Sequence, residues 1–60
     1  MAQKANLTKQ EAGEMAAEWL YRFMYEELGS SHEDGVNAAS SIYEYFTGEE
    51  IDVEELLGYN

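Results

Sequence analysis

The chain contains no cysteine, no proline and only one histidine. Without cysteine no disulfide can staple the fold, and a zinc site, which usually needs several Cys or His ligands, is disfavoured. A chain of 60 residues buries only about 60% of its unfolded surface, so a solitary fold of this size is marginal. Its stability must therefore come from good helix packing or from association with further copies.

Long hydrophobic runs are absent as well. No apolar stretch approaches the roughly 20 residues that span a bilayer. The start of the chain, MAQKANLTKQEAG, has no apolar segment that could form the centre of a secretory signal. Basic residues are too few to draw the chain to anionic lipid. We therefore expect a cytoplasmic protein without a membrane partner.

Positive charge is scarce, and this imbalance is the strongest feature of the composition. Lys and Arg together number 3, whereas Asp and Glu number 13, which gives a net charge of −10. Residues 31–60 contain no Lys or Arg at all. Strongly acidic chains are often disordered, but such chains have few aromatics. Here aromatics make up 13% and hydrophobic residues 45%. We therefore expect one acidic folded domain over residues 1–60, with a frayed start over residues 1–6.

Helix signals cover most of the chain. Thr8 and Glu11 form a capping box at the start of a first helix, and Gly29 ends it. The apolar residues between them follow helical spacing: Ala12, Met15, Ala16, Trp19, Leu20, Phe23, Met24 and Leu28. Ser30 or Ser31 caps a second helix, which ends at Gly48 and has an apolar stripe of Val36, Ala39, Ile42, Tyr43 and Phe46. Asp52 caps a short third helix that Gly58 ends.

These signals predict an all-α fold, a small three-helix domain with two main helices and a short C-terminal one. We expect Trp19, Phe23, Ile42 and Phe46 in its core, and we find no internal repeat. Small residues over Gly35 to Ser41 allow another helix to approach the second helix closely. Either the Trp19 and Phe23 stripe of the first helix packs there or a second copy does, so homodimerisation is an alternative way to complete the core.

Catalytic, cofactor and metal sites are not expected. His32 has no separated nucleophile or oxyanion hole around it, and we interpret it as an exposed helix-start residue. No EF-hand pattern and no glycine-rich phosphate loop occur. The chain is therefore interpreted as a non-enzyme. The third segment either covers the core of the first two helices or docks into a groove of a partner.

The charge favours a binding function. Direct binding of nucleic acid is disfavoured, because affinity for phosphate comes from Lys and Arg. A basic protein surface that normally holds nucleic acid is the natural partner. Duplex DNA carries about 16 charges over the roughly 27 Å diameter expected of such a globule. In size and charge the chain is similar to the small acidic proteins with which viruses of bacteria disable host nucleic-acid enzymes, but no motif supports a family.

We therefore predict an inhibitor or adaptor of DNA-mimic type. Its predicted partner-binding residues are Glu11, Glu14, Glu18, Tyr25, Glu44, Tyr45, Glu49, Glu50, Asp52, Glu54 and Glu55. The alternative is a helical homodimeric assembly or docking subunit whose acidity serves solubility.

Overall fold

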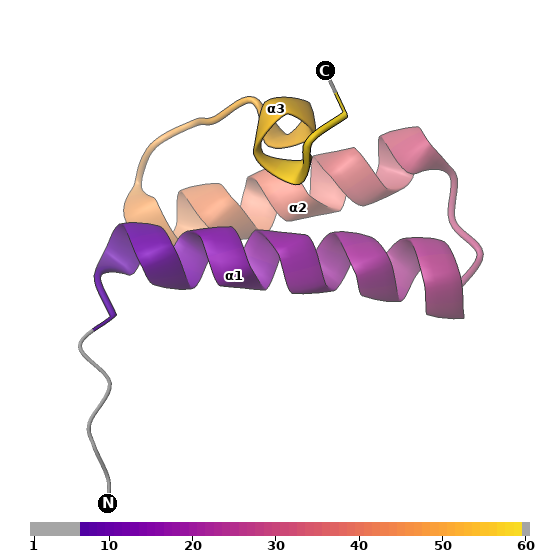
Figure 1. The fold of residues 1–60 in the computed structure, drawn as a ribbon, viewed down its shortest axis with the longest axis horizontal. Helices are drawn as coiled ribbons and strands as arrows, with labels where there is room; N and C mark the ends of the chain where they lie inside the picture. Colours follow the sequence, from indigo (N-terminus) through magenta and orange to yellow (C-terminus); the bar gives the residue numbers. More distant parts are fainter. Residues whose placement is uncertain (1–6, 60) are drawn as a thin grey trace, which may run out of the picture.

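A computed structural model describes residues 7–59 of the chain. The first helix, α1, runs over Lys9–Arg22 and continues directly into one π-helical turn, η1, over Phe23–Glu27. Then come α2, over His32–Thr47, and α3, over Val53–Leu57. Figure 1 shows α1 and α2 lying side by side and antiparallel, with α3 across them. The prediction of an all-α fold with two main helices and a short third one is confirmed.

The helix ends form where the sequence signals place them. Thr8 and Glu11 make the predicted capping box, in which the backbone N–H of each residue donates to the side chain of the other. Ser31, and not Ser30, caps α2, and the Asp52 carboxylate accepts from the backbone N–H groups of Glu54 and Glu55. Gly29, Gly48 and Gly58 all adopt positive φ, which L side chains rarely do.

One difference lies at the end of the first helix. We expected a regular helix up to Leu28, but the last turn is widened. The backbone N–H of Leu28 donates to the carbonyl of Phe23 at 3.2 Å, five residues back, and the N–H of Ser30 donates to the carbonyl of Met24 at 2.9 Å. Such a turn inserts one residue into the helical spacing and shifts the side chains beyond it around the helix.

An internal repeat, which we did not find in the sequence, becomes visible in the packing of the helix pair. The pattern Gly13-x-x-Ala-Ala17-x-x-Leu-Tyr21 recurs as Gly35-x-x-Ala-Ala39-x-x-Ile-Tyr43. Ala17 and Ala39 are both fully buried. Each tyrosine packs on the glycine of the other helix: a Cβ on Gly35 would lie 2.8 Å from Cδ1 of Tyr21, and one on Gly13 would lie 3.2 Å from Cδ1 of Tyr43. The pair thus has a local two-fold symmetry.

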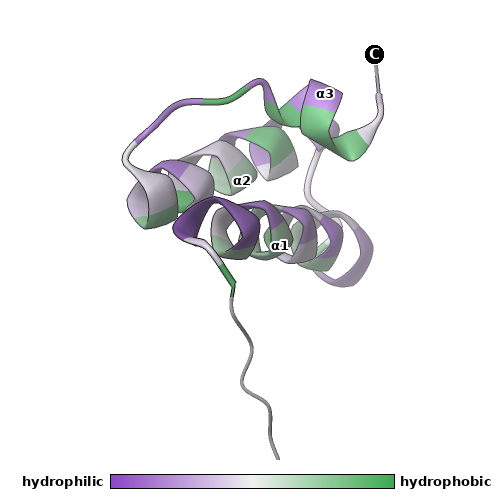
Figure 2. Ribbon diagram, turned by 60° about the vertical axis from the view of Figure 1, so that its left-hand side comes forward, coloured by the Kyte–Doolittle hydropathy of each residue, from purple (hydrophilic) through white to green (hydrophobic). Residues whose placement is uncertain are grey.

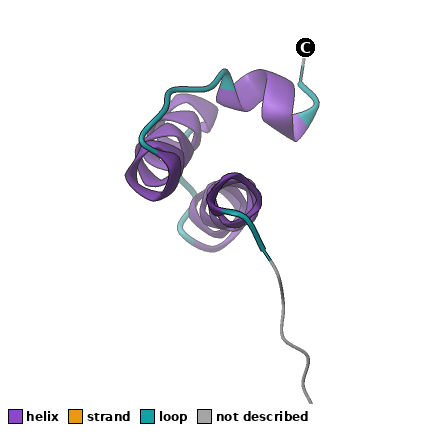
Figure 3. Cartoon of the chain, turned by 90° about the vertical axis from the view of Figure 1, so that its left-hand side faces the viewer, coloured by secondary structure: helices purple, strands orange, loops and turns teal. Residues whose placement is uncertain are grey.

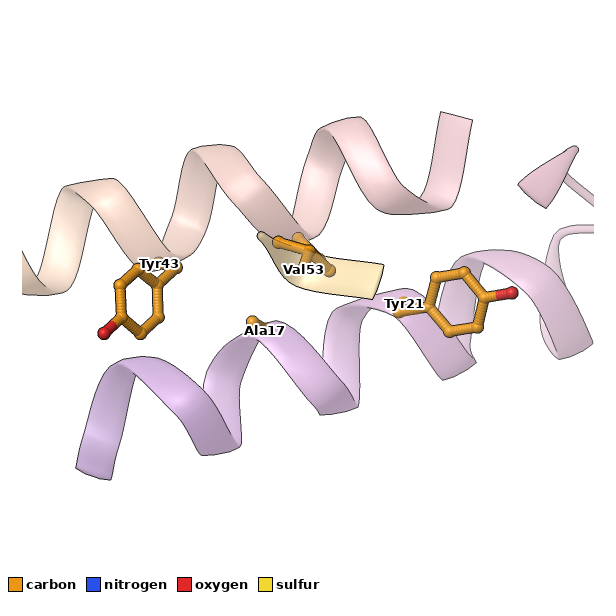
Figure 4. Close-up of a cluster of buried hydrophobic side chains, with 5 residues drawn as sticks. Ala17, Tyr21, Tyr43 and Val53 are labelled. Carbon is orange, nitrogen blue, oxygen red and sulfur yellow. The ribbon is translucent and has the colours of Figure 1, made fainter. Parts of the chain in front are cut away.

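The third helix covers one side of this pair. Figure 4 shows Val53 above Ala17, between the rings of Tyr43 and Tyr21. Val53 is 2% exposed, and partly buried apolar side chains surround this centre: Val36, Ile42, Ile51, Leu56 and Leu57. Of the two alternatives for the third segment, the structure shows the one in which it covers the core. Figure 3, which looks along the helix pair, shows that α3 lies on one side only.

The predicted core residues were mostly wrong. Trp19 is 61% exposed, Phe46 39% and Phe23 37%, and only Ile42 packs partly against the core. The apolar arc of each helix is wider than the strip that its neighbour covers, since large apolar side chains of both helices stay exposed. The hydropathy colouring in Figure 2 shows apolar and polar residues alternating along the helices. Ala17 and Tyr21 therefore pack against the small residues of α2, and the stripe of Trp19 and Phe23 does not.

Two absences concern residues 7–59. None of the helices there is long and apolar enough to cross a bilayer. In the same residues the structure has no pocket, and no group of three or more His, Asp or Glu side chains is arranged to hold a metal ion.

Candidate functional site

His32 joins three segments of the chain at one point. Its Nδ1 lies 2.7 Å from the hydroxyl oxygen of Tyr21 on α1, and its Nε2 lies 2.8 Å from Oε2 of Glu54 on α3. A neutral ring protonated at Nε2 accepts a hydrogen bond from the phenol and donates one to the carboxylate, whereas an imidazolium donates both. In either state the ring fastens α3 to the helix pair.

Aromatic rings surround this junction. Tyr25 stacks on Tyr21 with a centroid separation of 5.7 Å, and Tyr59 contacts Tyr21 at 5.7 Å and the edge of His32 at 5.3 Å. Burial is the main reason that the pKa of Tyr21 is raised to about 12, and the adjacent Tyr59 side chain and the negative charge of Glu54 raise it further. The Tyr21 phenol therefore stays neutral in the folded protein at ordinary pH.

The order carboxylate, imidazole, hydroxyl is also that of a catalytic triad. Here, however, the hydroxyl belongs to Tyr21, whose side chain lies under α3 and is only 4% exposed. A substrate cannot reach a hydroxyl in that position. The junction therefore acts as a structural tie between α3 and the pair.

Around this tie, α1, α3 and the segment before α3 each contribute carboxylates. On α1, Glu14, Glu18, Tyr21 and Tyr25 follow one another at helical spacing and form a single stripe. Because Tyr21 contacts Tyr59, which follows α3, this stripe runs beside α3. We call this surface the acidic face. It comprises Glu11, Glu14, Glu18, Glu49, Glu50, Asp52, Glu54 and Glu55, with Tyr25 and Tyr59.

Most of the predicted partner-binding residues lie in the acidic face, but two do not. Tyr45 is 86% exposed on α2, where its ring packs edge-on against Phe46, away from the stripe of Tyr25. Glu44 is exposed on α2, which is not one of the segments that contribute to the acidic face. Both residues therefore lie outside the acidic face.

The carboxylates of the acidic face differ in whether they make contacts that stabilise the fold. Asp52 caps α3, as predicted, and Glu54 is held by His32. Glu49 and Glu50 are exposed in the segment between α2 and α3, and within residues 7–59 the hydrogen bonds of Glu49 join its backbone to Thr47. These two side chains can therefore be changed with the least effect on folding.

Sequence reasoning missed the role of His32, Tyr21 and Tyr59 as a group. We interpreted His32 as an exposed helix-start residue, yet it forms the tie. A signal existed, because the repeat places the Tyr21 ring over Gly35, one turn from His32 at the start of the same helix. Glu54 lies too far along the sequence for any local pattern to connect it to His32.

Comparison of the chain with protein-family models, with curated proteins and with solved structures finds no match.

Proposed function

We propose that this chain is a non-enzymatic binding module whose acidic face occupies a basic surface of a partner protein, one that otherwise holds nucleic acid. The observation that carries this proposal is that α1, α3 and the segment before α3 all carry carboxylates around the tie between His32 and Glu54, and Figure 3 shows α3 on one side of the helix pair. Such a module inhibits its partner by competing with nucleic acid for the same basic residues.

The charge density supports a mimic that is weaker than a duplex. The protein measures 38 Å along its longest axis. Duplex DNA carries one charge per roughly 1.7 Å, which amounts to about 22 charges over that length. The chain has 13 carboxylates, which is about 60% of that number. This is a lower density than the sequence alone led us to expect, because the helix pair is elongated.

The exposed tyrosines add a short-range component. Tyr25 is 52% exposed and Tyr59 57% exposed, and both lie beside carboxylates of the acidic face. Tyrosine offers apolar area with a polar tip and is enriched among residues that dominate binding energy. Long-range attraction then sets how fast the partner is met, and tyrosine contacts set how long it stays.

The test is affinity capture on the immobilised chain followed by competition with duplex DNA. We expect captured partners to elute with rising salt and to be displaced by DNA, since both ligands need the same basic residues. A purified partner is then measured against two variants of equal net charge. Glu49→Lys with Glu50→Lys alters the acidic face, and Glu26→Lys with Glu27→Lys alters exposed carboxylates of η1.

The acidic-face variant should associate at least about tenfold more slowly at low salt, and the η1 variant should differ much less from the unchanged chain. Equal binding by both variants, or a partner that binds the chain and DNA together, contradicts the proposal. In that event the acidity serves solubility, and the assembly or docking subunit becomes the better interpretation.

A further inference from the structure

The side of the helix pair opposite α3 carries a second surface, which is apolar. In each helix, one residue precedes the buried tyrosine and another precedes the buried alanine. Each is rotated by about 100° about the helix axis from the buried residue that follows it, toward the side away from α3. With the aromatic side chains next to them they form what we call the apolar face. It comprises Ala16, Trp19, Leu20 and Phe23 from α1 and η1, and Ala38, Ile42, Tyr45 and Phe46 from α2.

This face leaves much aromatic area in solvent. Tyr45 is 86% exposed, Trp19 61%, Phe46 39% and Phe23 37%. The Trp19 and Phe23 rings stack flat on each other at 5.2 Å and so present one continuous aromatic surface. At about 200 Å² for each aromatic side chain, these four expose on the order of 450 Å² per chain. This area lies within the range of the largest apolar patch on a typical monomer, a patch that is often an interaction site.

Three observations identify the occupant as a second copy of the chain. First, the area suffices: two such faces, with their aliphatic centres, bury about 1,000 Å², which is the lower limit for a specific interface. Second, the repeat makes the face symmetric, because Leu20 and Ile42 occupy equivalent places, as do Ala16 and Ala38. In a two-fold interface this face packs against the same face of the other chain, so apolar residues of both helices meet apolar residues across it.

Third, the charges at the two ends of the face are complementary. Lys9 lies in line with Ala16 and Leu20 at one end, and Asp34 lies in line with Ala38 at the other end, by helical spacing. Both charged side chains are exposed. A second copy turned end for end would place Lys9 of each chain at the same end of the bundle as Asp34 of the other.

We propose that the chain forms a two-fold dimer through the apolar face, with the helix pairs reversed end for end, to give a four-helix bundle. The acidic faces then point outward on opposite sides. The dimer does not depend on the proposed function, although it would present two acidic faces to two partner molecules.

Sedimentation over a range of concentrations tests the dimer. The mass should rise from 6.8 kDa toward twice that value as the concentration increases, and high salt should preserve the dimer, because apolar burial drives it. This salt dependence is opposite to that expected for the complex with a basic partner, so failure of one proposal is distinguishable from failure of the other. A monomer at every concentration, or a series of higher oligomers, overturns the dimer.

Substitutions locate the interface. Trp19→Ser with Tyr45→Ser should weaken dimerisation at least about tenfold, the effect of losing one strong aromatic contact. Tyr25→Ser is the matched control, since Tyr25 is also about half exposed but lies on the acidic face, and it should have little effect. Circular dichroism at low concentration verifies that each variant keeps its helices. An equal effect of the control variant overturns the assignment of the face.

Disulfide trapping tests the end-for-end orientation, and the absence of native cysteine makes it specific. The variants Lys9→Cys and Asp34→Cys are mixed and oxidised. The reversed arrangement predicts that the mixed disulfide forms faster than either disulfide between like variants. Preferential coupling of Lys9→Cys with itself overturns the proposed orientation.

Discussion

Gly35→Ala is the most direct test of how the helix pair packs. A Cβ at this position would lie 2.8 Å from Cδ1 and 3.0 Å from Cε1 of Tyr21. Carbon atoms pack no closer than about 3.5 Å without repulsion, so the ring or the helix must move. The ring has little freedom, because His32 holds its hydroxyl, and Tyr25 and Tyr59 contact it.

Two opposing effects set the magnitude. Overpacking a well-packed site by one methyl group costs about 1–3 kcal/mol. Alanine favours a helix interior over glycine by about 1 kcal/mol, which offsets part of this cost. The net result should be a loss of about 1 kcal/mol, or a fall of roughly 4–8 °C in Tm for a domain of this size.

Thermal unfolding followed by circular dichroism measures the effect, and two variants control for helix propensity. Asn37→Ala, at an exposed position of α2, changes only the propensity and should raise Tm. In a Tyr21→Leu background the ring is absent, so Gly35→Ala should become stabilising. If Gly35→Ala raises Tm in the unchanged chain as much as Asn37→Ala does, the Tyr21 ring does not occupy the space beside Gly35.

Four further outcomes follow from the core and the tie. Val53→Ala should cost about 2 kcal/mol in denaturant unfolding, because it removes two methyl groups from a side chain that is 2% exposed; no loss would show that α3 is not docked. Phe23→Ala should cost only about 1 kcal/mol and not the 3–5 kcal/mol of a buried Phe, since Phe23 is 37% exposed. Because the folded pKa of Tyr21 lies above its ordinary value of 10.0, at about 12, folding favours the neutral phenol. Its contribution to stability is complete below pH 10 and is lost as the pH rises toward 12; alkaline unfolding should therefore show a stability loss in this window that Tyr21→Phe reduces, and an unchanged profile would contradict it. His32→Ala and Glu54→Ala should each lower the free energy of unfolding by about 1 kcal/mol. The double variant should lose less than the sum of the two, because both substitutions remove the same contact, and additive losses would show that the two side chains do not interact.

The helix ends were predictable because each signal acts over a few residues. The Thr8 side chain accepts from a backbone N–H three residues away, and Gly48 and Gly58 adopt left-handed φ in their own turns. Nothing elsewhere in the chain has to be known for these contacts to form. The acidic face was also largely predictable, since Glu14 and Glu18 share a helix flank by spacing alone.

The core was not predictable from the same spacing. The first helix has apolar residues around more than half of its circumference, and periodicity does not say which part a neighbour covers. The residues that decide this are the small ones: close approach at Ala17 and Ala39 is possible because Gly13 and Gly35 leave room for the opposite tyrosines.

The sequence by itself determined three helices, their ends and the strong negative charge, because capping, glycine conformation and composition are local or additive properties. Only the tertiary structure decided that Tyr21 and Tyr43 are buried while Trp19 and Phe23 stay exposed. It also decided that His32 meets Glu54, a contact between residues far apart in the chain. These outcomes depend on which surfaces are brought together, and the separation of an acidic face from an apolar face results from where α3 packs on the helix pair.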